Sequence, residues 1–230
     1  MNNFITPAFR ARRPLLAVIA PHPDDDILGC GLLINAARRA QWRVVVIALT
    51  DGQASHPNSV RWPHHALGRL RRAEMRRALD RLGASTVPLL FMGWRDGSLS
   101  KDASVIRLRR VVNAIGASDV AVASAQDRHP DHQAAWKIAW LATANSRAKL
   151  HAYAVWARSE GVARPFFSAG KSAKTWAIKA HRSQVTNYIA DDPEGFVFTR
   201  PVLDRLVTTA ETLILRGGKI VAAARSRFKK

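Results

Sequence analysis

The sequence predicts a doubly wound, Rossmann-like α/β fold, in which helices cover both faces of a mainly parallel sheet. Short apolar runs rich in Val, Ile, Leu and Ala alternate along the chain with segments of helical periodicity. The runs are almost continuously apolar, without a polar residue at every second position. This pattern is typical of parallel strands that are buried on both faces.

Five runs are the expected strands: 15–20 (LLAVIA), 43–50 (RVVVIALT), 87–93 (VPLLFMG), 119–125 (DVAVASA) and 150–157 (LHAYAVWA). Between them, apolar residues recur at helical spacing in four segments: 26–40, 65–83, 103–116 and 131–148. Gly83 and Gly116 stand where the second and third of these helices would end. Further along the chain we expect a helix around 172–187, a turn at DDPEGF (191–196) and a helix from about 201.

Length and composition favour a soluble globular protein. We expect the 230 residues to form a single domain, with a core from about 14 to 216 and a basic flexible tail from about 218 to 230. The first apolar run is too short to span a membrane, and HPDDD follows it where a signal peptide would have a small-residue cleavage site. A single cysteine, Cys30, excludes an internal disulfide and fits a cytoplasmic location.

The chain is strongly basic. It has 36 Lys and Arg residues against 17 Asp and Glu, a formal net charge of +19. Arginines gather in 69–82 and 107–110, and the chain ends in SRFKK. Such a surface suits nucleic acid, anionic lipid or a phosphorylated substrate, but it is equally typical of solvated helix faces. Positive charge alone therefore names no partner.

The first chemically informative motif is HPDDD (22–26), which directly follows the first expected strand. In open parallel sheets, ligands bind at the carboxyl ends of the strands. Carboxylates crowded at such a place repel one another and lose hydration, so some of them would protonate unless a cation is present. A divalent metal ion is the simplest partner for this motif.

A second motif, DRHPDH (127–132), follows the expected strand at 119–125. His22, Asp25 and His132 would then converge as two imidazoles and a carboxylate, the ligand set of a catalytic zinc site with an open position for water. Fe²⁺ or Co²⁺ could replace Zn²⁺ at such a site. Asp24 is free to take a proton from water, and His129 can carry positive charge toward a developing oxyanion.

A dinucleotide site was the main alternative for the same region. GCGLLI (29–34) begins like the glycine-rich fingerprint, and Asp51 follows the second strand, where such folds keep a ribose-binding acid. Ile34 replaces the third glycine, however, and Gly29 comes nine residues after Ala20, beyond the first turn where the pyrophosphate must bind. We therefore exclude a dinucleotide cofactor.

Several short motifs together resemble the PIG-L/LmbE-type zinc-dependent N-deacetylases, from about residue 14 to about 216. They are PHPDD (21–25), TDG (50–52), RxxE (71–74), LG (82–83), RDGSL (95–99), HPDH (129–132) and HRSQ (181–184). The resemblance implies a Rossmann-like fold and hydrolysis of acetamides, typically on N-acetylglucosamine units. The chain departs from the usual family pattern at two positions, where Asp26 replaces a glutamate and Gln53 replaces another.

The resemblance also implies residue roles. His22, Asp25 and His132 would be the zinc ligands, one ion per chain. Asp24 would be the general base, and His129 would stabilise the oxyanion and could act as the acid. Arg71 and Asp96 match positions that approach sugar hydroxyls in relatives.

The sequence thus predicts a zinc-dependent N-deacetylase acting on a small-molecule or glycolipid amino sugar, and its arginines suit an anionic substrate. Two rivals stay open: a zinc amidase that cleaves a different acyl group, and a non-enzymatic basic protein that binds nucleic acid or an anionic membrane. The intact HPDD and HPDH motifs favour an enzyme, because a binding module has no use for an open metal position. We expect no specific nucleic-acid partner, whereas peripheral membrane contact and the oligomeric state are left open.

Overall fold

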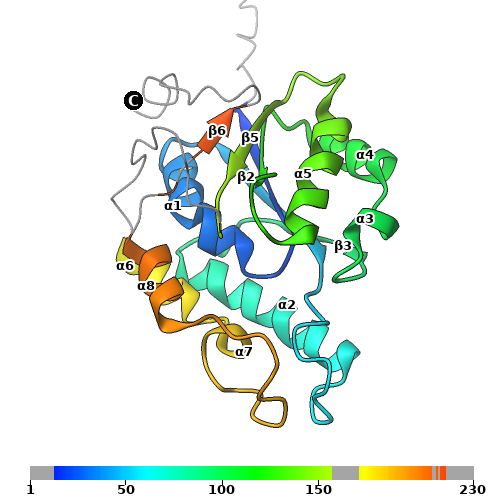
Figure 1. The fold of residues 1–230 in the computed structure, drawn as a ribbon. Coiled ribbons are helices and arrows are strands. Elements are labelled where there is room, and N and C mark those ends of the chain that lie inside the picture. Colours follow the sequence, from blue (N-terminus) through cyan, green and yellow to red (C-terminus); the bar gives the residue numbers. More distant parts are fainter. Residues whose placement is uncertain (1–12, 157–170, 209–210, 212, 216–230) are drawn as a thin grey trace, which may run out of the picture.

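The computed structural model describes residues 13–156, 171–208, 211 and 213–215, which form one six-stranded sheet of order β3-β2-β1-β4-β5-β6 (Figure 1). The strands are β1 (Leu15–Ala20), β2 (Arg43–Thr50), β3 (Leu89–Trp94), β4 (Asp119–Ala123), β5 (Lys149–Tyr153) and β6 (Leu213–Leu215). The first five are parallel, and β6 pairs antiparallel with β5. The predicted Rossmann-like α/β fold is confirmed.

The helices are α1 (Asp25–Arg39), α2 (His64–Arg81), α3 (Leu99–Asp102), α4 (Val105–Ile115), α5 (Pro130–Thr143), α6 (Lys171–Ile178), α7 (Arg182–Val185) and α8 (Arg200–Thr208). Among the described residues, none of these helices is long and apolar enough to cross a membrane.

The central strand β1 shows why the strands read as continuous apolar runs. Alternate side chains of a strand point to opposite faces of the sheet. Leu16, Val18 and Ala20 belong to the core cluster that packs against α1 and α2, whereas Leu15, Ala17 and Ile19 belong to the cluster that packs against α4 and α5. Every residue of β1 is buried, because helices cover both faces.

Most differences from the expected elements lie at their ends. β1 and β2 have the expected bounds, and Gly116 ends α4 in a left-handed conformation with φ of 67°. A short helix, α3, lies just before the segment 103–116 that contains α4, and the helix expected around 172–187 is divided into α6 and α7. Strand β6 was not predicted, because it has only three residues. The expected basic tail at 218–230 lies outside the described residues.

The order of the strands places a crevice at β1. The chain runs from β1 outward to β2 and β3, and later returns to place β4 on the other side of β1. Ligands of doubly wound folds bind at this switch point, beyond the carboxyl ends of the two strands. Both predicted motifs follow these strands, since HPDDD comes after β1 and DRHPDH comes after β4.

Candidate active site

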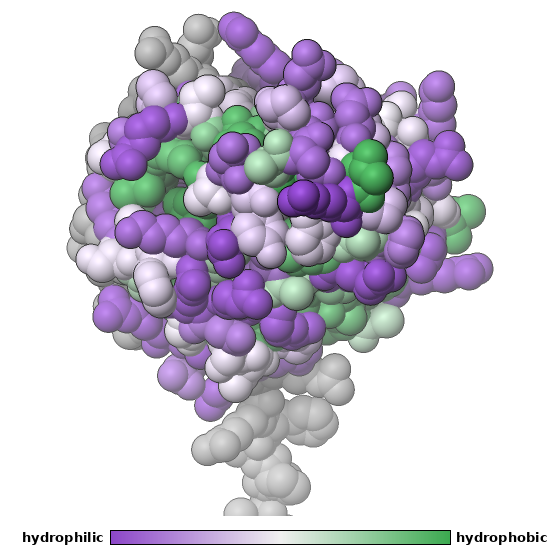
Figure 2. Space-filling view, turned by 90° about the horizontal axis from the view of Figure 1, so that it is seen from below, coloured by the Kyte–Doolittle hydropathy of each residue, from purple (hydrophilic) through white to green (hydrophobic). Residues whose placement is uncertain are grey.

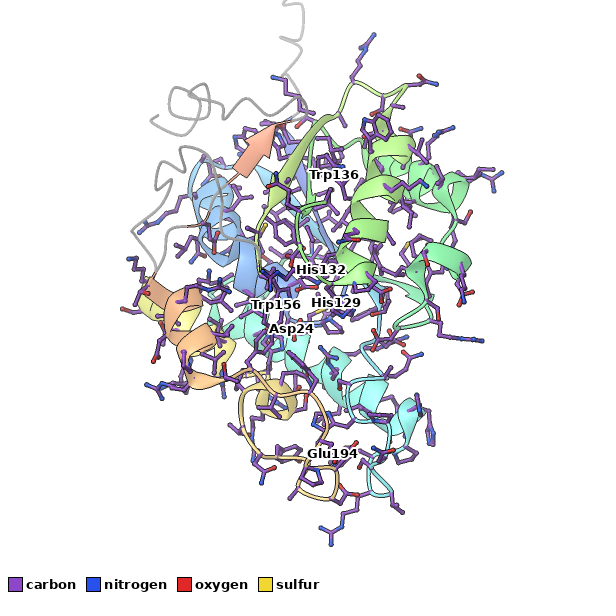
Figure 3. All side chains as sticks on the ribbon, viewed as in Figure 1. Asp24, His129, His132, Trp136, Trp156 and Glu194 are labelled. Carbon is purple, nitrogen blue, oxygen red and sulfur yellow. The ribbon has the colours of Figure 1, made fainter. Side chains whose placement is uncertain are left out.

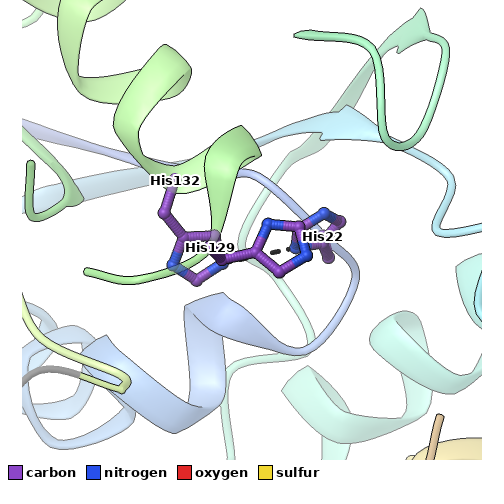
Figure 4. Close-up of side chains that lie close together, drawn as sticks. All are labelled: His22, His129 and His132. Carbon is purple, nitrogen blue, oxygen red and sulfur yellow. Dashed lines mark hydrogen bonds between the residues drawn. The ribbon is translucent and has the colours of Figure 1, made fainter.

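Three predicted donor atoms meet at the switch point. His22 Nδ1 lies 3.3 Å from Asp25 Oδ2 and 3.3 Å from His132 Nε2, and His132 Nε2 lies 3.2 Å from Asp25 Oδ2. Figure 4 shows His22, from the loop after β1, close to His129 and His132 at the start of α5. Tetrahedral Zn²⁺ with bonds of about 2.0–2.1 Å separates its ligand atoms by about 3.3 Å. The triangle therefore has the size of one face of a zinc tetrahedron.

Local backbone structure explains the spacing of the two motifs. Asp25 is the first residue of α1, and its Oδ2 accepts a hydrogen bond from the backbone N–H of His22 at 2.8 Å. His129 is the N-cap of α5, where its Nδ1 accepts from the backbone N–H of Asp131 at 3.2 Å, and Pro130 occupies the first helical turn. Each motif thus begins a helix, which presents the residues three apart on one side of its first turn.

Buried carboxylates hold the far nitrogens of both imidazoles. His132 Nδ1 lies 3.0 Å from Asp127 Oδ2, and Asp127 is fully buried. His22 Nε2 lies 3.2 Å from Asp96 Oδ1 and 3.3 Å from Asp131 Oδ2. A histidine that binds a metal through one nitrogen keeps its proton on the other and usually donates it to such a group. The sequence prediction missed Asp127 and Asp131, although both lie within DRHPDH.

The electrostatics of the triangle favour a cation. Burial alone would lower the pKa of His22, but its contacts with Asp131, Asp25 and Asp96 raise that pKa well above its ordinary value. Burial likewise opposes the charge on His132, whereas Asp25 and Asp127 raise its pKa to about 9. A site that stabilises two imidazolium ions in this way is negative overall, and a divalent ion would satisfy it in place of the protons.

Within the part of the chain that the structure describes, two other groups could also hold a metal: His22 with Asp96 and Asp131, and His22 with His129 and His132. In the first group, both carboxylates already accept hydrogen bonds from the backbone of neighbouring loops. Asp96 Oδ2 accepts from the backbone N–H of Ala54 at 2.8 Å, and Asp131 accepts from the N–H groups of Gly97 and Leu99 at 2.8 and 3.1 Å. In the second group, Nδ1 of His129 already caps α5. The geometry therefore favours the triangle at His22 Nδ1.

Asp24 lies beside the triangle and is held by Arg71. Arg71 Nη2 donates to Asp24 Oδ2 at 3.0 Å and Nη1 donates to the carbonyl of Gly52 at 2.8 Å, and both Asp24 and Arg71 are buried. Burial, opposed by Arg71, raises the pKa of Asp24 to about 6. The next acid, Asp26, is fully buried in the first turn of α1.

His129 faces the two other histidines without entering the triangle. Its ring centroid is 4.7 Å from that of His22 and 5.1 Å from that of His132. Burial, followed by the charges of His22 and His132, lowers the pKa of His129. A lowered pKa disfavours the protonated form of His129, and its role toward the oxyanion stays a prediction. With Nδ1 accepting from the backbone, its proton resides on Nε2.

All seven predicted site residues line one cavity of about 270 Å³. The same cavity is also lined by Trp156, Gln184, Phe196 and Phe198, which the sequence prediction missed. Figure 3 shows Asp24, His129, His132 and Trp156 close together in the middle of the molecule, whereas Trp136 and Glu194 lie away from them. This volume is close to the lower limit of about 300 Å³ for small-molecule sites, which suits a small ligand.

A protein-family model matches more than half of the chain. The PIG-L family model, described as GlcNAc-PI de-N-acetylase, matches residues 17–143, which is 127 of the 230 residues and includes both histidine motifs. The chain belongs to the PIG-L family of de-N-acetylases. None of the curated protein sequences compared with this PIG-L family member matches it.

Solved structures share the fold of this PIG-L family member at low sequence identity. The N,N'-diacetylchitobiose deacetylase of Pyrococcus horikoshii is 20% identical, with a TM-score of 0.71 over 90% of this chain and 85% of that one. A zinc-inhibited form of the teicoplanin deacetylase Orf2 is 18% identical, with a TM-score of 0.61 over 89% and 100%. A 4-carboxy-2-hydroxymuconate hydratase, GalB of Pseudomonas putida, is also 18% identical, with a TM-score of 0.61 over 73% and 78%. Since the fold also carries a hydratase, the reaction has to be argued from the site.

Proposed function

We propose that this PIG-L family member is a metal-dependent N-deacetylase that removes acetyl from an amino sugar of the N-acetylglucosamine type. The observation that carries the proposal is the triangle of His22 Nδ1, Asp25 Oδ2 and His132 Nε2, with Asp24 beside it in the same cavity. The substrate class is supported by the family description and by the diacetylchitobiose deacetylase among the similar structures.

In this proposal, His22, Asp25 and His132 hold one divalent ion per chain. Zn²⁺ fits the dimensions and chemistry of the donors, and Fe²⁺ or Co²⁺ could replace it, because such a ligand set discriminates weakly between them. When bound, the ion supplies a Lewis acid for the amide carbonyl and lowers the pKa of water. Asp127, Asp96 and Asp131 keep the two imidazoles oriented through their far nitrogens.

Asp24 and His129 perform the proton and charge chemistry. Asp24 accepts the proton of the attacking water, and Arg71 holds its carboxylate toward the cavity. Nε2–H of His129 donates to the carbonyl oxygen as that oxygen gains negative charge, a contribution of about 3–4 kcal/mol for one well-placed donor. The C–N bond then breaks, the leaving nitrogen takes up a proton from Asp24 or His129, and acetate and a free amine are released.

Arg71 has a different role here from the one inferred by resemblance. It lines the cavity, but both of its terminal nitrogens are engaged by Asp24 and Gly52. We therefore assign it to positioning the base. Asp96, the other predicted sugar-binding residue, also lines the cavity, and its Oδ1 contacts His22 Nε2. In this proposal it binds a substrate hydroxyl only through a carboxylate lone pair that this contact does not use.

An amine-release screen with and without chelator tests the proposal. The panel contains N-acetylglucosamine, its phosphates and glycosides, the matching N-propionyl and N-butyryl amides, and a hydratase substrate that has no amide. The proposal requires equal amounts of acetate and amine, metal dependence and the highest rate on the acetamide. Faster release of the longer acyl groups would indicate a different amidase, and reaction of the amide-free compound alone would indicate a hydratase.

A binding protein is the remaining rival. A DNA shift assay from about 50 to 200 mM salt separates it from an enzyme, because binding driven by phosphate contacts falls steeply over that range. Sequence-selective binding that persists at the higher salt, together with no amine release, would favour the binding protein.

A further inference from the structure

One wall of the cavity is aromatic. Trp156 and Phe198 stack with ring centroids 5.0 Å apart and an interplanar angle of 13°. Phe196 meets both rings edge-on, with its centroid 5.9 Å from that of Trp156 and 4.9 Å from that of Phe198. These three residues, the aromatic wall, line the same cavity as His22, Asp25 and His132.

Backbone hydrogen bonds fix the wall relative to the proposed metal ligands. The N–H of Phe196 donates to the carbonyl of Ser55 at 2.7 Å, and that of Phe198 donates to the carbonyl of Gln184 at 2.8 Å. The N–H of Trp156 donates to Asp127 Oδ2 at 3.2 Å, the oxygen that also holds His132. Asp127 therefore holds both the aromatic wall and a proposed metal ligand, so the fold determines the distance between the wall and the triangle.

The wall leaves apolar surface open to solvent. Phe198 is 6% exposed, whereas Phe196 is 41% exposed. Seen from below Figure 1, the side on which the loop with Glu194 lies, the molecule shows apolar residues gathered within a mostly hydrophilic surface (Figure 2). When an apolar group of a ligand covers exposed aromatic surface in a cavity, the free energy of the complex falls, which favours binding.

The charges of the cavity do not favour an anion. Among the described residues that line it, Arg71 is the one arginine or lysine, and Asp24 and Gly52 occupy its terminal nitrogens. The acids Asp24, Asp25 and Asp96 line the same cavity. Away from the triangle, a phosphate on the substrate would find no free lysine or arginine among the described residues that line the cavity.

We propose that the substrate carries an apolar aglycone, alkyl or aryl, next to the N-acetylated sugar, and that the aromatic wall binds it. This inference rests on the proposed deacetylase function for the position of the sugar, since the scissile amide must lie at the triangle. Covering about 50–60 Å² of apolar surface is worth about a tenfold gain in affinity. The inference replaces the anionic substrate that the basic sequence suggested with a neutral, partly apolar one.

Binding to the metal-depleted protein tests the wall without hydrolysis. The probes are N-acetylglucosamine, its phenyl and octyl β-glycosides and its 1-phosphate, with dissociation constants from calorimetry. We expect the phenyl or octyl glycoside to bind about tenfold tighter than the free sugar, and the 1-phosphate to bind no tighter. Equal binding of glycoside and free sugar, or tightest binding of the phosphate, would overturn the proposal.

Two variants assign the preference to the wall. Phe196→Ala should reduce the advantage of the glycosides to about threefold or less, and Phe196→Tyr should restore most of it. Trp176→Ala is the control, because Trp176 is 54% exposed but does not line the cavity, and it should leave the advantage unchanged. A parallel amine-release assay separates the two claims: a glycoside preference without hydrolysis refutes the deacetylase and keeps the wall, whereas hydrolysis without preference refutes the wall.

Discussion

Replacing Asp127 with Asn should weaken metal binding, although Asp127 is not a proposed ligand. Its Oδ2 holds His132 Nδ1 at 3.0 Å and accepts from the N–H groups of Val155 and Trp156 at 3.4 and 3.2 Å. Asn has nearly the same shape but no charge. Its amide oxygen can take the place of Oδ2, and its NH2 group then takes the place of Oδ1, which is buried and has no hydrogen-bond partner in the described part of the chain. The carboxylate that orients and polarises His132 is therefore lost.

The structure sets the size of the effect. Loss of a carboxylate behind a metal-binding histidine costs about 10–100-fold in metal affinity, which is about 1.4–2.7 kcal/mol. Because Asp127 is fully buried, the amide NH2 of Asn, which has no acceptor at the Oδ1 position, should also lower the free energy of unfolding by about 1–3 kcal/mol. Competition with a chelator of known affinity measures the first quantity, and urea unfolding measures the second.

Asp119→Asn is the matched control. Asp119 Oδ1 lies 2.9 Å from His151 Nε2, so this change also removes the charge from a carboxylate–histidine contact, but neither residue lines the cavity. It should lower stability without changing metal affinity. Unchanged zinc affinity in Asp127→Asn, or an equal loss in both variants, would refute the argument that Asp127 acts through His132.

Three further predictions follow from the site. Chelation should abolish amine release and lower the melting temperature, and adding back Zn²⁺, Co²⁺ or Fe²⁺ should restore both; full activity without metal would contradict the proposal. Arg71→Lys should lower kcat about tenfold with little change in KM, because Asp24 loses one of its supports; a rise in KM alone would return Arg71 to substrate binding. Burial, followed by Arg71, lowers the pKa of His181 to about 3. In the unfolded chain the pKa of His181 is about 6.5, so below pH 6.5 the unfolded state takes up a proton that the folded state does not. The free energy of unfolding therefore falls by about 1.4 kcal/mol per pH unit below pH 6.5. His181→Gln should remove that slope, and an unchanged difference between the variants from pH 7 to 5 would contradict it.

The sequence predicted the parts of the molecule in which local pattern and global packing agree. β1 and β2 are buried on both faces, so their apolar runs give the strand bounds directly. His22, Asp25 and His132 could be placed together because the carboxyl ends of neighbouring parallel strands meet at one edge of a sheet.

Other features depend on contacts between segments far apart in the chain. Phe196 and Phe198 follow a turn and have no periodic pattern, and they reach the cavity through hydrogen bonds to Ser55 and Gln184. Arg71 belongs to a basic helix, and its RxxE motif marked it as a site residue without indicating its partner. Its pairing with Asp24, 47 residues away, becomes evident only when α2 packs beside the first turn of α1. Asp127 is the exception, since its place in DRHPDH was a signal that could have been used.

The most direct test of the central claim is the metal content of two neighbouring isosteric variants, Asp24→Asn and Asp25→Asn, measured by elemental analysis on protein loaded with Zn²⁺ and then desalted. The account predicts about one zinc per chain in Asp24→Asn, whose rate of amine release should fall by about 10²–10⁴ because a positioned base is lost. It predicts that Asp25→Asn retains little zinc, because a ligand oxygen is lost from the triangle. Full zinc content in Asp25→Asn, or an empty site in Asp24→Asn, would contradict the assignment of the triangle as the metal site and of Asp24 as the base.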